Sequence, residues 1–321
     1  MLTISVVIPC YNRARTIGEA IASVHAQTRA PLELIIVDDG SSDASAEIAE
    51  RAGARVVRLS ENRGNAAARN VGIQTAAGDV IAWLDSDDYW DSHHLATVAA
   101  LLDRYPDAAV ASAAVRFVGT RSGTWHGAVP EGPPTNVARR AFYATVIPMS
   151  SAIVRRDALI DVGGFDETER VAVDFDIWLR LSLKHNFVAT REVTANYRWH
   201  MDQISDQPER QWEATYRFRK HALDVMRDGD GALRSDLATI CRNRWEADLW
   251  TAWEQGRTKW LRNLVALAPL IPNVRWTLKW KWIGRSYIPA PVVPLLRVAY
   301  WNTRSNFLIG RRSGAHRTTT H

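Results

Sequence analysis

No acidic residue follows Glu254 in this sequence. The last 67 residues, 255–321, contain twelve Lys and Arg and therefore carry a formal charge of +12. Residues 1–254 hold the other 28 basic residues and all 35 acidic ones, a net charge of −7, so the overall +5 averages two unlike parts. This division excludes one uniformly charged surface, and the two parts are expected to meet different partners.

Cysteine and long apolar runs are also scarce. Cys10 and Cys241 are too few for a disulfide framework or a zinc-ligand set, and each is expected to be a small buried side chain. The longest uncharged stretches of the basic tail, 263–274 and 286–296, contain proline and fall short of the ~20 residues that a spanning helix needs. The N-terminus has no basic segment before its short apolar run, so no signal peptide is predicted and a cytoplasmic start is expected.

What the first hundred residues do contain is an alternation of apolar strands with helices. Apolar runs predict strands at residues 4–9, 32–37, 54–59 and 80–84. Helical spacing predicts helices over 13–28, from Ser42 as N-cap, and over 64–75. Apolar strands joined by helices indicate a mostly parallel α/β sheet covered on both faces, in which ligands bind beyond the carboxyl ends of the strands.

Acidic residues follow two of these strands at that edge. Asp38 and Asp39 follow the second strand, and Asp85, Asp87 and Asp88 follow the fourth. Carboxylates this close repel one another unless a cation or a hydrogen-bonding ligand neutralises them. Hard oxygen ligands of this kind suit Mg²⁺ or Mn²⁺ bound together with substrate phosphates. Turn and helix-cap chemistry explains either segment alone, but a cation site explains the two together.

Six segments, taken in order, resemble family 2 glycosyltransferases with the GT-A fold. They are SVVIPCYNR, ELIIVDDGSSD, NRGNAAARNVGI, GDVIAWLDSDDYW, VGGFDE and DFDIWLRL, and the resemblance extends over residues 4–205. It implies a Rossmann-like, mostly parallel sheet flanked by helices, and an inverting sugar transfer that uses a nucleotide donor, a divalent metal and an aspartate base. The implied catalytic domain is 1–206, with a nucleotide-sugar half (1–104) and an acceptor half (105–206). A mainly helical, Trp-rich region with a basic tail follows over 207–321.

The resemblance implies where the donor binds. Asp39 would accept the uracil imide hydrogen, Tyr11 would offer an aromatic face and Arg69 a further polar contact, which favours a uridine donor. Two alternatives stay open at this point: Tyr11 could simply cover the end of its strand, and Arg69 could form an ion pair with one of the acids. The implied nucleotide-sugar site is completed by Pro9, Asp85 and Ser86.

The triplet Asp85-Ser86-Asp87 resembles the DxD motif of the family. Two carboxylates two residues apart at a strand end point the same way, so one can address the ribose while the other binds the metal at the diphosphate. Asp87 is the first candidate for the metal, with Asp85 and Asp88 as alternatives, and the expected ion is Mn²⁺ or Mg²⁺. The Tyr-Arg-x-His segment at the end of the resemblance implies His200 as a further ligand, with a surface hydrogen-bonding His as the alternative.

The segment VDFDIWLRL resembles the Glu-Asp-x-Asp motif of the family and implies Asp174 as the general base that removes the proton of the acceptor hydroxyl. Val173 stands where the family usually has Glu. This departure puts one hydrogen-bonding or acceptor-positioning role in doubt, and a raised pKa of Asp174 in a more apolar neighbourhood is a hypothesis. The alternatives are an N-cap role for Asp174 and a first-turn acid, favourable to the helix dipole, for Asp176.

The resemblance gives a less specific expectation for the residues that contact the acceptor. Gly163 and Gly164 resemble the loop beside the acceptor, or else they end a short helix over 156–162. The Gly-, Pro-, Ser- and Thr-rich stretch 119–135 is predicted to be a loop on the acceptor side. The implied acceptor-side residues are Gly164, Phe165, Asp176 and Arg198.

The C-terminal region has two kinds of pattern. Trp245, Leu249 and Trp253 fall on one face of a predicted helix. In the basic tail 255–321, Trp alternates with Lys over 275–283, a pattern that suits an anionic membrane surface. A partner protein, an oligomer contact and a merely solvated tail are alternatives. Nucleic acid is disfavoured, because residues 1–254 are acidic and no RNA-binding motif occurs.

These patterns together predict an enzyme that is peripheral on the cytoplasmic face of a membrane. It would move a sugar, with inversion, from a nucleotide-sugar donor to a hydroxyl of a glycan or lipid-linked acceptor, in cell-surface polysaccharide or glycolipid synthesis. The alternative is a nucleotide-sugar-binding or scaffold protein of the same fold that has lost turnover, which only Val173 supports. A sugar-phosphate nucleotidyltransferase would need a Gly-rich basic phosphate loop after the first strand, and residues 9–13, PCYNR, do not supply one.

Overall fold

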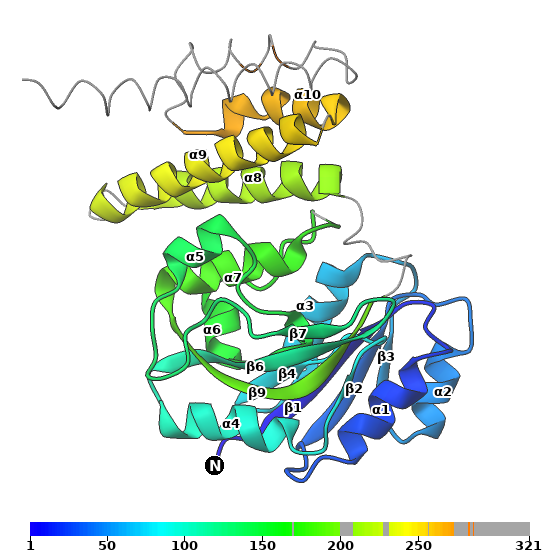
Figure 1. Ribbon diagram of the computed structural model, residues 1–321. Helices are drawn as coiled ribbons and strands as arrows, with labels where there is room; N and C mark the ends of the chain where they lie inside the picture. The colour runs from blue at the N-terminus through cyan, green and yellow to red at the C-terminus, as the bar shows by residue number, and fades with distance from the viewer. Residues whose placement is uncertain are drawn as a thin grey trace, which may run out of the picture. The chain divides into compact units, whose positions relative to one another are not determined.

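The computed structural model describes residues 1–168, 170–199, 208–226, 231–255 and 257–272, together with residues 282 and 285. They belong to two compact units, Met1–Asp230 and Gly231–His321, whose elements are labelled in Figure 1. Helix α8 (Pro208–Val225) lies in the first unit, whereas the sequence prediction assigns its residues to the C-terminal region.

A nine-stranded sheet is the centre of the first unit. Its strands are β1 (Ile4–Cys10), β2 (Glu33–Asp38), β3 (Arg55–Arg58), β4 (Val80–Trp83), β5 (Tyr89–Trp90), β6 (Ala108–Gly119), β7 (Gly123–Trp125), β8 (Ala152–Arg155) and β9 (Asn186–Trp199). The order is β3–β2–β1–β4–β8–β6–β9–β5, with β7 paired to β6. Strands β1 to β4 are parallel, β8 is antiparallel to both neighbours, and β9 is parallel to β6. The predicted mostly parallel α/β sheet is confirmed.

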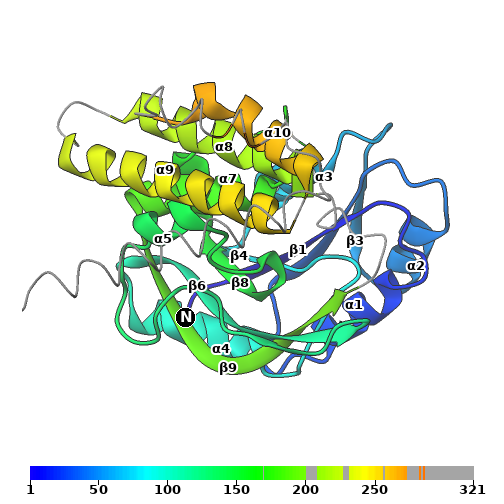
Figure 2. The ribbon, with the colours of Figure 1, turned by 45° about the horizontal axis from the view of Figure 1, so that its top comes forward.

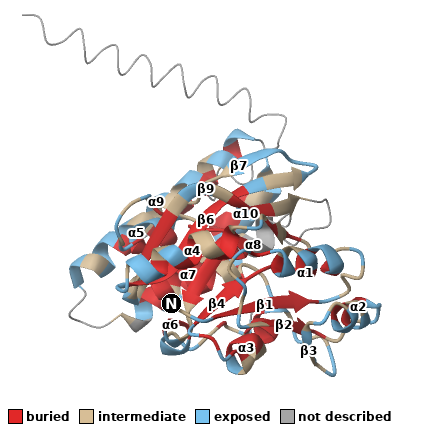
Figure 3. Ribbon diagram, turned by 90° about the horizontal axis from the view of Figure 1, so that it is seen from below, coloured by how far each residue is buried: buried red, intermediate tan, exposed pale blue. Residues whose placement is uncertain are grey.

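Helices cover both faces of this sheet. Before α8 the chain forms α1 (Ile17–His25), α2 (Ser45–Arg51), α3 (Asn65–Thr75), α4 (His94–Arg104), α5 (Ala138–Tyr143), α6 (Arg156–Asp161) and α7 (Val173–Lys184). Figure 3 shows α1 and α3 on opposite faces of β1 and β2, whose strands are buried. Helix α1 buries the i, i+3, i+4, i+7 stripe that its sequence predicts. Because both faces are covered, the strands can be continuous apolar runs.

The predicted N-cap at Ser42 is wrong. Helix α2 begins at Ser45, and Ala44 occupies the capping position. The turn before the helix is held from outside instead: Asn12 Oδ1 accepts the Ser42 amide hydrogen at 2.9 Å, and Asp43 Oδ2 accepts that of Ala14 at 3.0 Å. These contacts to the end of β1 accompany a helix start two residues later than predicted, and they tie the first two strand ends together.

The long strands β6 and β9 carry the sheet beyond its parallel half, as Figure 2 shows. Their register pairs Phe117 with Tyr197 and Gly119 with Trp199, after three register shifts earlier in the pair. The stretch 119–135, predicted to be a loop, contains β7, whose Gly123 pairs with Phe117. The sharp hairpin is formed because Gly119 and Gly123 adopt φ values of +99° and +116°, which favour glycine.

Helix α8 is fixed to the first unit by a buried arginine. Arg219 is 3% exposed and donates to the carbonyl oxygens of Phe142 and Tyr143, at 2.5 and 3.0 Å. Its guanidinium carbon lies 4.6 Å from the ring centroid of Phe175 and 4.9 Å from that of Tyr216. One side chain therefore joins α8 to the end of α5 and to the first turn of α7.

The described part of the second unit contains the helices α9 (Gly231–Glu254) and α10 (Thr258–Ala266). The predicted apolar face of α9 is confirmed, because Trp245, Leu249 and Trp253 are buried. The Trp245 indole donates to the Leu264 carbonyl at 2.7 Å. Cys241 is buried, as Cys10 is in the first unit, which agrees with the expectation for both cysteines.

Most of the basic tail lies outside the described residues. Of the stretch 275–283 the structure describes Trp282, which is 1% exposed and lies edge-on to Trp250 at 5.1 Å between centroids. Arg285 lies over the rings of Trp250, Trp253 and Trp282 at 4.8 to 4.9 Å. Among the helices described, none has both the length and the apolar character needed to cross a bilayer.

Candidate active site

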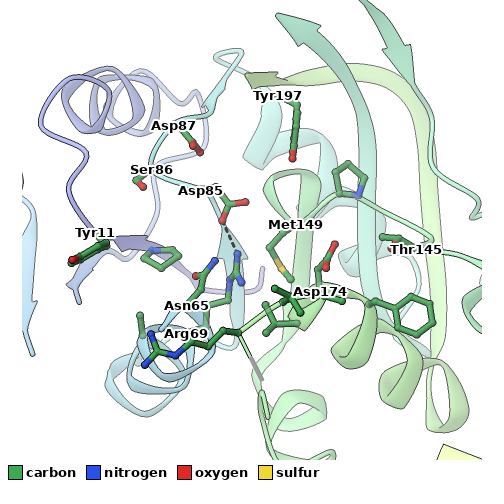
Figure 4. Close-up of a pocket in the computed structure, with 18 of the residues that line it drawn as sticks. Tyr11, Asn65, Arg69, Asp85, Ser86, Asp87, Thr145, Met149, Asp174 and Tyr197 are labelled. Atoms are coloured by element: carbon green, nitrogen blue, oxygen red, sulfur yellow. Dashed lines mark hydrogen bonds and ion pairs between the residues drawn. The ribbon is translucent and has the colours of Figure 1, made fainter. Parts of the chain in front are cut away.

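A cavity of about 760 Å³ opens beyond the carboxyl ends of β1, β2 and β4, at the edge where the sequence predicts a ligand. Figure 4 shows side chains from separate elements pointing into it. The predicted site residues that line it are Pro9, Tyr11, Asp39, Arg69, Asp85, Ser86, Asp87 and Asp174. We call Asp39, Asp85, Asp87 and Asp174 the carboxylate wall. The thiol of Cys10 also lines the cavity, but burial raises its pKa to about 12, which excludes a reactive thiolate.

Asp39 is fixed by the chain that leads into α3. Its Oδ1 accepts the Arg63 amide hydrogen and its Oδ2 that of Gly64, both at 2.8 Å. The turn directly after Asp39 needs glycine at position 40, where φ is +73° and a Cβ would lie 2.7 Å from the Glu61 carbonyl carbon. The carboxylate is therefore immobile and 3% exposed, with further lone pairs for one more donor.

Arg69 reaches across from α3 to the end of β4. Its Nη2 lies 2.7 Å from Asp85 Oδ1, an ion pair drawn as a dashed line in Figure 4. The Phe165 ring lies 5.5 Å from the guanidinium. The open alternative of an ion pair to one of the acids is thus the observed arrangement. Burial raises the pKa of Asp85, Arg69 opposes this rise, and the neighbouring Asp87 adds to it.

Asp88 supports the loop rather than lining the cavity. Its Oδ2 accepts from the Ser150 hydroxyl at 2.5 Å and its Oδ1 from the Arg198 amide at 2.8 Å. The same Ser150 oxygen accepts the Asp85 amide hydrogen at 3.1 Å. Burial, followed by the charges of Asp87 and Asp85, raises the pKa of Asp88 well above its usual value. Asp88 thus anchors the motif at its back.

Asp87 is the second carboxylate of the motif that lines the cavity and could bind a cation. Its side chain is 18% exposed, and Arg13 Nε lies 3.5 Å from its Oδ2. Among the described residues no cluster of three or more His, Cys, Asp or Glu could hold a metal ion by itself. His200, the predicted extra ligand, lies outside them. The residues nonetheless fit a divalent ion that also takes substrate phosphate oxygens, because Asp85 and Asp87 are hard donors whose mutual repulsion a cation would relieve.

Asp174 lies in the first turn of α7 and faces the cavity. The N-cap of α7 is Ala172, in the left-handed region at φ +55°, so an N-cap role for Asp174 is wrong. Burial raises the pKa of Asp174, the Asp85 charge adds to this rise, and the Phe175 amide and Arg69 oppose it. Val173 is 8% exposed and also lines the cavity. The direction of the pKa shift is the one hypothesised from this apolar neighbour.

Four residues implied for the acceptor side do not line the cavity. Phe165 is buried against Trp83 at 5.4 Å, and Asp176 pairs with Arg180 inside α7. The Arg198 guanidinium donates to the backbone oxygen of Asp87 at 2.8 Å and to Glu19 at 2.5 Å. Gly164 has φ +67°, and its amide donates to the Leu159 carbonyl. The glycines therefore end α6, which was the alternative.

The part of the cavity that sequence reasoning missed is aromatic. Figure 4 shows Tyr197 from β9 pointing its hydroxyl into the space between Asp85, Asp87 and Asp174. Burial, with the nearby carboxylates, raises the pKa of this phenol, so it stays neutral. A usable signal was present in the aromatic residues at positions 197 and 199, whose two-residue spacing is typical of one face of a strand. The lining rings, which we call the aromatic wall, are Phe117, Trp125, Tyr197 and Trp199.

Comparison with known proteins identifies one family and several relatives that this sequence matches. A model described as Glycosyl transferase family 2 matches residues 5–163. The chain is 32% identical over 196 residues to the succinoglycan biosynthesis protein ExoU of Rhizobium meliloti, covering 55% of this chain and 56% of that protein. It is 26% identical over 212 residues to an uncharacterized glycosyltransferase of Rickettsia prowazekii, covering 63% and 66%. The matched region thus spans less than two thirds of these relatives.

Solved structures give the same fold. Residues 1–349 of Staphylococcus aureus TarS in complex with UDP-GlcNAc superpose with a TM-score of 0.70 at 21% identity, over 84% of this chain and 82% of that one. The mannosyltransferase PcManGT of Pyrobaculum calidifontis, in complex with GDP-Man and Mn²⁺, gives 0.56 at 18% identity, over 89% and 86%. At these identities the likeness establishes the GT-A type fold of the chain.

Proposed function

Because the chain belongs to glycosyl transferase family 2 through its residues 5–163, we propose that it transfers a sugar, with inversion, from a nucleotide-sugar donor to an acceptor hydroxyl. One observation carries the proposal: Asp39, the Asp85–Asp87 motif and Asp174 line a single cavity. One bound donor could therefore reach the residue for its nucleobase, the residues for its diphosphate and the general base. The chemistry below follows from these side chains.

The donor is proposed to be a UDP-sugar. Asp39 is held by two amides and keeps acceptor capacity for a ring N–H, while Tyr11 is 44% exposed at the cavity and offers its face for stacking. The TarS structures, named for their complexes with UDP and UDP-GlcNAc, support uridine. PcManGT is named with GDP-Man, so the preference for uridine rests mainly on Asp39.

Asp87, with Asp85 beside it, would hold Mn²⁺ or Mg²⁺ together with the donor diphosphate. When bound, such an ion neutralises the charge that develops on the departing nucleoside diphosphate. Arg69 keeps Asp85 oriented, and Arg13 lies beside Asp87 on the same side of the cavity. His200 stays a proposed additional ligand.

Asp174 is proposed as the general base. Its carboxylate takes the proton of the acceptor hydroxyl while that oxygen bonds to the anomeric carbon and the bond from this carbon to the diphosphate oxygen breaks. Burial raises its pKa, which strengthens it as a base as long as it stays ionised. Val173 contributes no acid, so positioning of the acceptor must come from other residues of the cavity.

The acceptor is proposed to be a glycan or lipid-linked glycan in cell-surface polysaccharide or glycolipid synthesis. The relative named for succinoglycan biosynthesis supports a polysaccharide product. The +12 of residues 255–321 supports attraction to an anionic membrane surface on the cytoplasmic side. Flotation with anionic and neutral liposomes tests this: the full chain should float with the anionic ones, and Lys279→Glu with Lys281→Glu should weaken it. Equal flotation of both proteins would contradict the membrane part alone.

Nucleotide release is the direct test of the activity. UDP-, dTDP- and GDP-sugars are incubated with Mn²⁺ or Mg²⁺ and the freed nucleotide is measured, with Asp87→Asn as the metal-site variant. We expect release from a UDP-sugar, its loss with a chelator, and a drop of about 10²-fold or more in the variant. A protein that binds UDP tightly but never releases it from a UDP-sugar, whatever acceptor or metal is supplied, would be the scaffold alternative instead.

A further inference from the structure

The aromatic wall is the part of the cavity that the proposed chemistry leaves without a role. Its rings come from three paired strands: Phe117 from β6, Trp125 from β7, and Tyr197 and Trp199 from β9. The centroids of Phe117, Tyr197 and Trp199 lie 5.9 to 6.1 Å from one another. Because the register places Phe117 beside Tyr197, the cluster is built by the sheet itself.

Glycines at the paired positions leave these rings uncovered. Gly123 pairs with Phe117, and a Cβ at this glycine would meet nothing within 4 Å. Gly119 pairs with Trp199, and a Cβ there would lie 2.5 Å from the Trp199 carbonyl oxygen. Cross-strand side chains normally cover their neighbours on a sheet. Here no side chain covers these two rings from the paired position, and both rings line the cavity beside Arg121, which lies over part of them.

Arg121 lies in the turn between β6 and β7 and stacks on this cluster. Its guanidinium carbon is 4.3 Å from the Phe117 centroid and 4.8 Å from the Trp199 centroid. The side chain is exposed and lines the cavity. Stacking on two rings orients the planar guanidinium, while its N–H donors point outward from the edge of the group.

The other arginines of the cavity already have polar partners. Arg13 lies 3.5 Å from Asp87, Arg69 lies 2.7 Å from Asp85, and Arg170 donates to the side chain of Asn62 at 2.9 Å. Within the part of the chain that the structure describes, Arg121 makes no hydrogen bond and no ion pair. It is therefore the cavity arginine whose donors are available to an anion.

We propose that the aromatic wall and Arg121 form an acceptor subsite for a sugar ring that carries an anionic group, either a carboxylate or a phosphate. The apolar face of the ring would stack on Phe117 and Trp199, and the guanidinium fork would bind the two anionic oxygens. This inference rests on the proposed function, since it assigns the acceptor class of the same cavity. Tyr11 and Asp39, the proposed nucleobase contacts, lie at the ends of β1 and β2, away from the three strands of this wall.

Three tetrasaccharides of one linkage test the proposal: a glucuronic acid tetrasaccharide, the neutral glucose tetrasaccharide, and the latter with one 6-phosphate. Binding is measured by calorimetry in the presence of UDP and Mn²⁺, because fourteen tryptophans would confuse a fluorescence signal. We expect an anionic tetrasaccharide to bind about tenfold more tightly than the neutral one. Whichever anionic probe binds more tightly identifies the source of the charge.

Two variants and a matched control locate the effect. Arg121→Gln should bring the anionic tetrasaccharides to the affinity of the neutral one, and Trp199→Leu should weaken all three several-fold, because the stacking face is lost. Arg104→Gln is the control: Arg104 is also exposed and stacks on Tyr105 at 5.1 Å, but it does not line the cavity. It should bind all three like the wild type.

Unchanged anionic preference in Arg121→Gln, or unchanged neutral binding in Trp199→Leu, would overturn the subsite. So would wild-type protein that binds UDP but none of the tetrasaccharides. Failure of the proposed function has a different signature, because no nucleotide would then be released from a UDP-sugar in the presence of Mn²⁺ or Mg²⁺, whatever the tetrasaccharide titrations show. The two ideas can therefore fail separately.

Discussion

The two walls of the cavity use charge in opposite ways. In the carboxylate wall each acid has a partner within the fold: Asp39 takes two amides, Asp85 takes Arg69, Asp87 lies beside Arg13 and Asp174 takes the Phe175 amide. Beside the aromatic wall the charge is that of Arg121, which stacks on two rings and makes no ion pair among the described residues. The carboxylate wall is suited to stabilising charge that develops during a reaction. The aromatic wall offers stacking faces beside one cation, which suits ligand binding.

If the carboxylate wall serves the reaction and the aromatic wall serves ligand binding, Asp174→Asn should affect the chemical step. We expect kcat to fall by about 10²–10⁴-fold, because the variant cannot accept the acceptor proton. KM for the acceptor should change little, since Asn keeps the shape of Asp and no side-chain contact to the aromatic wall is lost. Steady-state kinetics with a saturating UDP-sugar check this. Full activity in a folded variant would remove Asp174 from the role of base.

The carboxylate wall could be predicted from sequence because its residues lie in short motifs at strand ends. Asp39 and the Asp85–Asp87 triplet need only the position of their strands to be brought together, and Asp174 follows from its motif before an apolar helix. The direction in which a side chain points was harder to predict. Phe165 and Arg198 belong to segments that resemble the family, yet Phe165 is buried beside Arg69 and Arg198 donates to the backbone oxygen of Asp87.

The aromatic wall could not be predicted in the same way, because it depends on pairing between strands. Phe117 and Tyr197 are eighty positions apart, and the shifts in the β6–β9 register decide that they meet. β7, which contributes Trp125, falls in a stretch whose glycines and prolines indicate a loop. Local patterns give the strands, but the register between distant strands is a tertiary property.

The next largest effect is expected on stability, in the carboxylate wall. Arg69→Gln should lower the free energy of unfolding by about 2 kcal/mol, because it removes the buried guanidinium that pairs with the partly buried Asp85 carboxylate. The matched control is Arg58→Gln, whose ion pairs with Glu47 and Glu50 are exposed, so its effect should be much smaller. Urea unfolding of both variants measures the difference. Equal effects would mean that the Arg69–Asp85 pair is not buried in the way described.

The pH dependence of the rate should reflect the burial of Asp174. Its pKa is raised above that of an exposed aspartate, and the proposed base must be ionised. As pH falls through this raised pKa, the carboxylate takes up a proton and the rate drops, so the acid limb of kcat/KM should lie above the usual aspartate range. Val173→Ser, which makes the neighbourhood more polar, should move the limb to lower pH. An identical limb in both proteins, measured at saturating metal, would exclude this cause.

Tyr197 lies where the two walls meet. Tyr197→Phe removes its hydroxyl and keeps its ring, so the two contributions can be measured separately. The ring would remain in the aromatic wall, so KM for the acceptor should be nearly unchanged. The hydroxyl among the carboxylates would be lost, and kcat should fall by roughly tenfold or less, the value of one hydrogen bond. Because burial and the carboxylates raise the pKa of this phenol, it stays a neutral donor, and the loss should be the same from pH 6 to pH 9. A rise in KM with kcat unchanged would instead assign Tyr197 wholly to acceptor binding.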